Sequence, residues 1–152
     1  MSDITLHVNG TPHRVAVQDT TLLLDALRLK VGVTSVREGC GVGACGSCTV
    51  LADGRSVSSC LANARRYEGA ELTTADGLAQ DDPVVASFVD SDAMQCGYCI
   101  PGFVLMTKEL LAENPEPSDE QITDHLEGNI CRCATYPEIL RAVRLAATRS
   151  AG

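Results

Sequence analysis

The first half of the chain alternates between apolar and polar residues, which is the period of a β-strand with one buried face. The opening segment of this kind ends at Asn9-Gly10, a pair that accepts the positive φ angles of a two-residue hairpin turn. The inward positions of the two flanking strands are Ile4, Leu6, Val8, Val15 and Val17. The pattern therefore predicts a β-hairpin at the N-terminus.

A short helix and a second hairpin are predicted to follow. Asp19-Thr20 has the composition of a helix N-cap and precedes a helical pattern from Thr21 to about Lys30, whose leucines can cover the first hairpin. Beyond a loop rich in Gly and Cys, residues 49–52 and 55–58 flank Asp53-Gly54, which is again a hairpin signal. This order of elements predicts a β-grasp-like sheet that ends near residue 75.

The second half changes to a period of about three and a half residues, which is typical of amphipathic helices. Ser118 and Gln121 have the spacing of a capping box, Gly128 closes that helix, and Pro137 suits the first turn of a last helix. The expected apolar faces are Val84, Val85, Phe88 and Val89; Phe103, Met106 and Leu110; Ile122 and Leu126; and Ile139, Leu140, Val143 and Ala147. We expect an α+β protein with domains at residues 1–75 and 76–152.

Composition directs attention to the cysteines. The 152 residues are 45% hydrophobic and 21% charged, as in a globular protein, which excludes disordered and collagen-like chains. Three Tyr, two Phe and no Trp are a thin supply of large side chains for two small domains. Small domains often add disulfides or metal sites to their cores, so the eight Cys are the main chemical signal.

The net charge of −8 argues against a nucleic-acid partner, because affinity for phosphate backbones comes from clustered Lys and Arg. No secretion signal is recognisable at the N-terminus, and no apolar stretch approaches the roughly 18 residues of a membrane span. A cytoplasmic location is therefore expected, without a direct membrane span. Export or membrane association through a partner protein would leave no mark in this sequence.

The eight cysteines fall into two sets of four. The first cysteine set, Cys40, Cys45, Cys48 and Cys60, has the spacing C-x4-C-x2-C-x11-C. The second cysteine set, Cys96, Cys99, Cys131 and Cys133, has the spacing C-x2-C-x31-C-x-C. Four thiolates are what a [2Fe-2S] cluster needs, and C-x4-C-x2-C is the plant-type ferredoxin spacing, although here the fourth Cys follows sooner.

Other chemistries compete for these residues. Nothing indicates the oxidising compartment that a disulfide framework needs, whereas zinc remains the stronger alternative because C-x2-C pairs are common zinc ligands. The run Gly41-x-Gly43-x-x-Gly46 matches a dinucleotide fingerprint, but it leads into a predicted strand instead of opening a helix. The three His are expected to be surface side chains, because the eight Cys already complete two sets of four.

Three motifs then occur in order along the chain. They are Glu38-Gly39-Cys40 through Cys45-Gly46-Ser47-Cys48-Thr49-Val50, then Gln95-Cys96-Gly97-Tyr98-Cys99-Ile100-Pro101-Gly102, then Gly128-Asn129-Ile130-Cys131-Arg132-Cys133. By these motifs the chain resembles, over nearly its whole length, the small iron-sulfur subunit of the molybdenum hydroxylases, or xanthine oxidase family. The resemblance implies a plant-type ferredoxin-like β-grasp domain that holds an outer [2Fe-2S] cluster on the first cysteine set. It also implies a C-terminal four-helix domain that holds an inner [2Fe-2S] cluster on the second.

The same resemblance implies partners and further cofactors. In the family the inner cluster lies next to the molybdopterin of a separate large subunit, and by motif the residues that touch the pterin are Gln95 and Cys133. The molybdopterin is expected in its cytosine dinucleotide form. The acceptor of the electrons stays open among an FAD-binding medium subunit, a haem-containing cytochrome and a quinone-linked carrier.

The expected function is therefore electron transfer, one electron at a time, from molybdopterin through both clusters during oxidative hydroxylation of an aldehyde or an N-heterocycle. No catalytic residue is expected in this chain. Ala134-Thr135-Tyr136-Pro137 departs from the Thr-Gly-Tyr of much of the family and looks more like members that act on isoquinoline, nicotinate and some aldehydes. The alternative is a free two-cluster ferredoxin, which accounts for the cysteines but not for Gln95.

Overall fold

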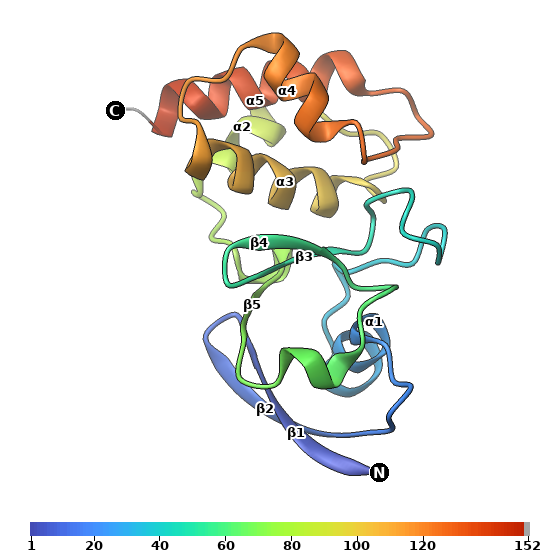
Figure 1. The fold of residues 1–152 in the computed structure, drawn as a ribbon. Helices are drawn as coiled ribbons and strands as arrows, with labels where there is room; N and C mark the ends of the chain where they lie inside the picture. The colour runs from blue at the N-terminus through green and yellow to red at the C-terminus, as the bar shows by residue number, and fades with distance from the viewer. Residues whose placement is uncertain (151–152) are drawn as a thin grey trace.

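Five strands form one mixed sheet in the computed structural model, which describes residues 1–150 (Figure 1). The strands are β1 Ser2–Val8, β2 Thr11–Val17, β3 Thr49–Ala52, β4 Arg55–Ser58 and β5 Glu71–Thr73. Their order is β2-β1-β5-β3-β4, with β1 and β5 parallel and the other neighbours antiparallel. This arrangement confirms the predicted β-grasp architecture.

Both predicted hairpin turns are present. Asn9 and Gly10 have φ angles of 52° and 76°, and Asp53 and Gly54 have φ angles of 50° and 81°. Two successive positive φ values are the requirement of a type I′ turn, which explains the Asn-Gly and Asp-Gly pairs. Asn9 also ties the first turn to the end of the sheet, since its amide donates to Thr74 Oγ1 at 2.9 Å.

The helix after the first hairpin begins later than the sequence indicates. It starts as α1 Leu23–Asp25 and continues as a π-helical segment, Ala26–Val31, which ends at Gly32 with a φ of 92°. Its inward side chains, Leu23, Leu24 and Leu27, are buried against the first hairpin, as expected.

The predicted cap of this helix, Asp19-Thr20, is wrong. The N-cap residue is Leu22, which makes no side-chain capping bond. The neighbouring polar side chains have other partners, since the Asp19 carboxylate pairs with Arg65 at 2.9 Å and the Thr21 hydroxyl accepts from the Gln18 amide at 2.9 Å. A tertiary ion pair thus takes the Asp19 carboxylate and a local turn takes the Thr21 hydroxyl, so neither side chain caps the helix.

Four helices follow the sheet, as predicted. They are α2 Pro83–Asp90, α3 Ile100–Glu113, α4 Asp119–Leu126 and α5 Tyr136–Ser150. The capping box at Ser118 and Gln121 is present, with both reciprocal hydrogen bonds. One expected inward residue is misplaced: Val89 is 59% exposed, because it follows the buried Phe88 by one position and one position turns a side chain about 100° around a helix. No helix within residues 1–150 combines the length and the apolar character needed to cross a membrane.

The apolar side chains form two separate cores. One lies between the sheet and α1 and runs from Ile4 to Leu72, and the other lies among the helices and runs from Val84 to Ala146. Helix α3 packs across β3 and β4, so it is the element that joins the two halves (Figure 1). The domain boundary predicted at residues 75 and 76 falls between these cores.

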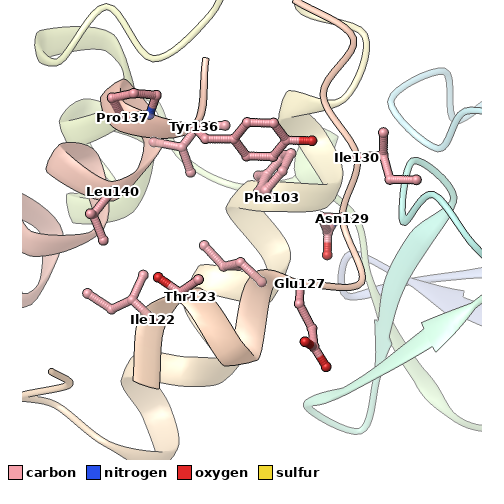
Figure 2. Close-up of a pocket in the computed structure, with 11 residues that line it drawn as sticks. Phe103, Ile122, Thr123, Glu127, Asn129, Ile130, Tyr136, Pro137 and Leu140 are labelled. Carbon is pink, nitrogen blue, oxygen red and sulfur yellow. The ribbon is translucent and has the colours of Figure 1, made fainter. Parts of the chain in front are cut away.

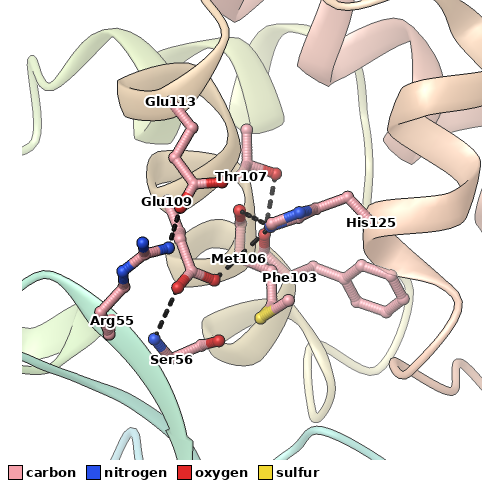
Figure 3. Close-up of polar contacts among 8 residues, drawn as sticks. All are labelled: Arg55, Ser56, Phe103, Met106, Thr107, Glu109, Glu113 and His125. Atoms are coloured by element: carbon pink, nitrogen blue, oxygen red, sulfur yellow. Dashed lines mark hydrogen bonds and ion pairs between the residues drawn. The ribbon is translucent and has the colours of Figure 1, made fainter.

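Polar contacts on α3 bind the two halves together (Figure 3). The Glu109 carboxylate is buried and accepts from the backbone amide of Ser56 on β4 at 2.8 Å. His125 Nε2 lies 3.5 Å from the other Glu109 oxygen, with its side chain 20% exposed. The expectation that His125 is a surface side chain is therefore wrong, because α4 packs this ring against α3.

Candidate iron-sulfur sites

The first cysteine set surrounds the start and end of the β3–β4 hairpin. Cys40 and Cys45 lie in the loop before it, Cys48 immediately precedes β3, and Cys60 follows β4. Because β3 and β4 are antiparallel, Cys48 and Cys60 are brought side by side, and Ser59 donates from its hydroxyl to the Cys48 carbonyl at 2.6 Å. The loop thus carries the first two cysteines of the set, and the two ends of the hairpin carry the other two.

The loop points backbone N–H groups at sulfur. The amides of Val42 and Ala44 donate to Cys40 Sγ at 3.4 and 3.3 Å. These two bonds, in that order, lower the pKa of the exposed Cys40 thiol to about 7, and the Cys45 side chain lies in hydrogen-bonding contact with it. Gly41 and Gly43 have positive φ angles, which allow the loop to wrap so closely.

The remaining thiols of the first set are less accessible. Burial raises the pKa of Cys60 to about 11, with a further contribution from the Cys48 thiol in contact with it. Cys60 also lies within electrostatic range of Cys40, so all four members of the set come together.

The second cysteine set is built from three segments. Cys96 lies after α2, Cys99 is the N-cap residue of α3, and Cys131 and Cys133 lie between α4 and α5. Cys96 is in side-chain contact with Cys133, and Cys99 with Cys131.

The second set also combines exposed and buried thiols. The backbone amide of Tyr98, followed by the Cys133 side chain, lowers the pKa of the exposed Cys96 thiol. Burial raises the pKa of Cys99 to about 12. Each set therefore has one exposed thiol that ionises readily and one buried thiol that resists ionisation.

Cys131 receives contacts that sequence reasoning did not assign. Its sulfur lies 3.1 Å from the hydroxyl oxygen of Thr135, and its backbone amide donates to the Tyr136 hydroxyl at 2.8 Å. Burial raises the pKa of the Cys131 thiol, but hydrogen bonds with the hydroxyl and amide of Thr135, together with those with Cys99 and Cys133, outweigh burial, so the net shift is downward. The Tyr136 ring in turn packs edge-on against Phe103, with centroids 6.3 Å apart (Figure 2). The only signal of these contacts was the departure at Ala134-Thr135-Tyr136.

The two residues expected to touch a pterin lie near each other. Gln95 is exposed and adjoins the exposed Cys96, whose sulfur contacts the partly buried Cys133.

The two cysteine sets lie next to each other across a seam between the halves. A cavity of about 300 Å³ is lined by two members of each set, Cys40, Cys45, Cys96 and Cys99. The backbone amide of Ile130 donates to the Cys45 carbonyl at 3.0 Å, which places the first set one residue from Cys131.

Side chains beside the cysteines hold the seam closed. Arg37 donates to the Gly97 carbonyl at 2.5 Å, and its guanidinium lies over the Tyr98 ring, 5.3 Å from the centroid. The Tyr98 hydroxyl donates to the Glu38 carbonyl at 2.7 Å. Sequence reasoning missed Arg37, although Glu38 and Tyr98 stand inside the motifs that it singled out.

The donor chemistry of both sets fits [2Fe-2S] clusters. All eight cysteines of the described chain are free, so each set offers four soft sulfur ligands. The positive charge of iron deprotonates a thiol that it binds, which offsets the burial of Cys60 and Cys99. Within residues 1–150 no three Cys, His, Asp or Glu side chains converge on one metal ion. A two-iron cluster does not need three protein ligands on one metal ion, since each iron takes two of the four thiolates.

Comparison with known proteins gives a match in each half of the chain. Residues 6–79 match the 2Fe-2S iron-sulfur cluster binding domain, and residues 74–144 match the [2Fe-2S] binding domain. The chain is 46% identical to a nicotinate dehydrogenase subunit of Pseudomonas putida over 95% of this chain and 94% of that one. It is 42% identical to the nicotinate dehydrogenase small FeS subunit of Eubacterium barkeri over 97% of this chain and 96% of that one.

Solved structures give the same result. Quinoline 2-oxidoreductase from Pseudomonas putida 86 contains a chain with a TM-score of 0.94 and 37% identity, covering 99% of this chain and 96% of that one. The aldehyde oxidoreductase from Desulfovibrio desulfuricans matches with a TM-score of 0.95 and 42% identity over 100% of this chain and 17% of that one.

A chain that contains two different [2Fe-2S]-binding domains is an electron-transfer iron-sulfur protein. This chain belongs to the molybdenum hydroxylase family, as an iron-sulfur subunit that transfers electrons while the catalytic site lies on a different polypeptide. Family membership favours the subunit over the free two-cluster ferredoxin. It also makes zinc the weaker assignment for the two cysteine sets.

Proposed function

We propose that the first cysteine set ligates the outer [2Fe-2S] cluster and the second cysteine set the inner one. The observation that carries the proposal is the gathering of eight thiols into two neighbouring groups of four, on loops held by the hairpin and by α3. When bound, each cluster accepts and releases one electron. The chain's own part is to fix the separation of the two groups and to direct N–H and O–H groups at their sulfurs.

The partner is a large subunit that binds molybdopterin, in our proposal as the cytosine dinucleotide, and Gln95 and Cys133 contact the pterin. The exposure of Gln95 beside the Cys96–Cys133 pair supports this assignment. An amide offers a donor and an acceptor on one short side chain, which suits the edge of a pterin ring. The electrons then pass to an FAD-binding subunit, a haem-containing cytochrome or a quinone-linked carrier.

The substrate class that we propose for the whole enzyme is an N-heterocyclic aromatic compound or an aldehyde. Support comes from relatives named nicotinate dehydrogenase, quinoline 2-oxidoreductase and aldehyde oxidoreductase, which this chain matches over nearly its whole length. We also propose a domain boundary between residues 75 and 76, which the two separate cores support. The compartment that we propose is the cytoplasm.

The test is metal analysis of the chain purified without oxygen. Two clusters require about four irons and four acid-labile sulfides per chain, and two distinct EPR signals after reduction. Cys60→Ser is expected to remove one signal and Cys131→Ser the other, each with about half of the iron and sulfide. Zinc without sulfide, or loss of both signals to either single substitution with the chain still folded, contradicts the assignment.

The partner is tested separately by co-purification. A stable complex with a much larger molybdenum-containing chain supports the subunit. In that complex Cys131→Ser is expected to stop reduction of the acceptor by substrate even though molybdenum is present, and normal acceptor reduction would contradict the proposed route.

A further inference from the structure

The segment after the second cysteine set folds back over Cys131. The backbone amide of Ala134 donates to the Cys131 carbonyl at 3.3 Å, and Ala134 has a φ of 61°, in the left-handed region that reverses the chain direction. Thr135 is thereby turned inward and is only 3% exposed. A hydroxyl buried in this way needs a partner among the protein groups around it.

That partner is the sulfur of Cys131. Thr135 Oγ1 and Cys131 Sγ lie 3.1 Å apart, and either atom can donate while the cysteine is a free thiol. A thiolate bound to iron carries no proton, so in the loaded protein the hydroxyl is the donor. The direction of the bond is therefore fixed by ligation itself.

The geometry is held by two further bonds. Tyr136 accepts from the backbone amide of Cys131 at 2.8 Å, which fixes the main chain that carries the sulfur. The Thr135 carbonyl accepts from the amide of Ile139 at 3.0 Å, in the first turn of α5. Thr135 is thus bonded to the first turn of α5, and the Cys131 amide is bonded to Tyr136, the first residue of α5.

A hydrogen bond to a ligand sulfur acts on the reduction potential. Reduction adds negative charge that spreads onto the sulfurs, and a donor pointing at a sulfur stabilises the reduced state more than the oxidised state. The effect is stronger where water is excluded, because the local dielectric is low. Thr135 and Cys131 are both buried, so their bond meets this condition.

We propose that Thr135 is a tuning residue that raises the reduction potential of the cluster on the second cysteine set by donating its hydroxyl hydrogen bond to Cys131. This rests on the proposed function, in which Cys131 is a ligand of that cluster. The result is an inner cluster that accepts an electron from the molybdenum side more readily.

The test is an EPR-monitored redox titration of the loaded chain. The signal that Cys131→Ser removes identifies the second cluster, and the other signal serves as an internal reference. Thr135→Val keeps the shape and removes the hydroxyl, so it is expected to lower the midpoint of the second cluster. The expected change is about tenfold in the redox equilibrium, which corresponds to about 59 mV for one electron. Thr135→Ser restores the hydroxyl and is expected to restore the midpoint, while the first cluster stays unchanged in both variants.

Thr148→Val is the matched control, since Thr148 lies near the C-terminal end of α5, the helix that Thr135 precedes, and its hydroxyl donates to the Arg144 carbonyl, away from the cysteines. Thr135→Ala repeats the test with a smaller side chain if the valine hinders loading. A wild-type midpoint for the second cluster in Thr135→Val or Thr135→Ala overturns the proposal, and so does an equal shift of both clusters. Absence of both EPR signals from the unsubstituted chain contradicts the proposed function instead.

Discussion

Gly102 and Gly46 approach so closely that a Cβ on Gly102 would lie closer than 3.0 Å to the Gly46 carbonyl oxygen. The first residue belongs to the opening turn of α3 and the second to the loop between Cys45 and Cys48. The carbonyl cannot easily move aside, because it already accepts from the amide and the hydroxyl of Thr49 at 3.2 and 2.8 Å. The distance between the two halves at this seam is thus limited by contact between backbone atoms.

Gly102→Ala is expected to destabilise the loaded chain. The added methyl group meets backbone rather than a flexible side chain, and overpacking of this kind costs about 1–3 kcal/mol. For a chain of this size the melting temperature is expected to fall by roughly 2–10 °C. Gly128→Ala is the matched control, since a Cβ there meets nothing within 4 Å. Equal melting temperatures for the two variants would show that the contact with Gly46 carries no cost.

Glu109 is expected to contribute more to stability than Glu113, although both lie on α3 and both reach β4 (Figure 3). Glu109→Ala removes a buried carboxylate that accepts from the Ser56 amide and lies 3.5 Å from His125 Nε2, and loss of a hydrogen bond to a charged group costs about 1.5–3 kcal/mol. Glu113→Ala removes an exposed ion pair with Arg55 and is expected to cost no more than about 1 kcal/mol. Thermal unfolding of both variants decides the order, and Glu109→Gln, which keeps an acceptor, is expected to fall between them.

Removal of the clusters is expected to expose large differences in thiol reactivity. Only the thiolate is alkylated, so in the cluster-free chain Cys40, with a pKa of about 7, is expected to react quickly at neutral pH. Its rate is expected to rise with pH and to level off above about 7. Cys60, with a pKa of about 11 and a buried side chain, stays protonated and is expected to react slowly, with a rate still rising above pH 9.

Iodoacetamide labelling followed by mass spectrometry measures these rates residue by residue. The same chain in denaturant is the control, where all eight cysteines are expected to react alike. The cluster-loaded chain is expected to be protected at all eight. Equal labelling of Cys40 and Cys60 at pH 7 in the folded, cluster-free chain would contradict the opposite environments assigned to them.

Gln95→Ala is expected to slow the transfer of electrons from the molybdenum-containing partner without changing the isolated chain. One lost hydrogen bond contributes about 0.5–1.5 kcal/mol, so reduction of the second cluster by substrate is expected to slow roughly two- to tenfold. Stopped-flow absorbance of the whole complex measures this rate. Gln80→Ala, another exposed glutamine, serves as the control, and an identical slowing in both variants would remove the special role assigned to Gln95.

Much of the fold is predictable from local sequence, for identifiable physical reasons. Asn9-Gly10 and Asp53-Gly54 encode turn geometry in adjacent residues, and Ser118 with Gln121 encodes a cap within one helical turn. The cysteine spacings likewise divide into two sets without knowledge of the fold. Each of these signals depends on neighbours along the chain, so a sequence pattern can carry it.

Features that depend on distant contacts were missed. Asp19 has the chemistry of a cap but pairs with Arg65, which no local pattern reveals. His125 is drawn inward only because α4 packs against α3 at Glu109. The contact between Thr135 and Cys131 was missed for another reason: the residues are only four positions apart, but the contact needs the left-handed backbone of Ala134, which alanine seldom adopts.

The seam joins two segments that are synthesised at different times. All members of the first cysteine set, with the hairpin that carries two of them, are synthesised before Cys96. The amide of Ile130, which meets the Cys45 carbonyl, belongs to the last segments to emerge. The loop that carries Cys45 is therefore made before the segment that binds it, and the separation of the two cysteine sets is fixed only when the later segment meets the earlier one.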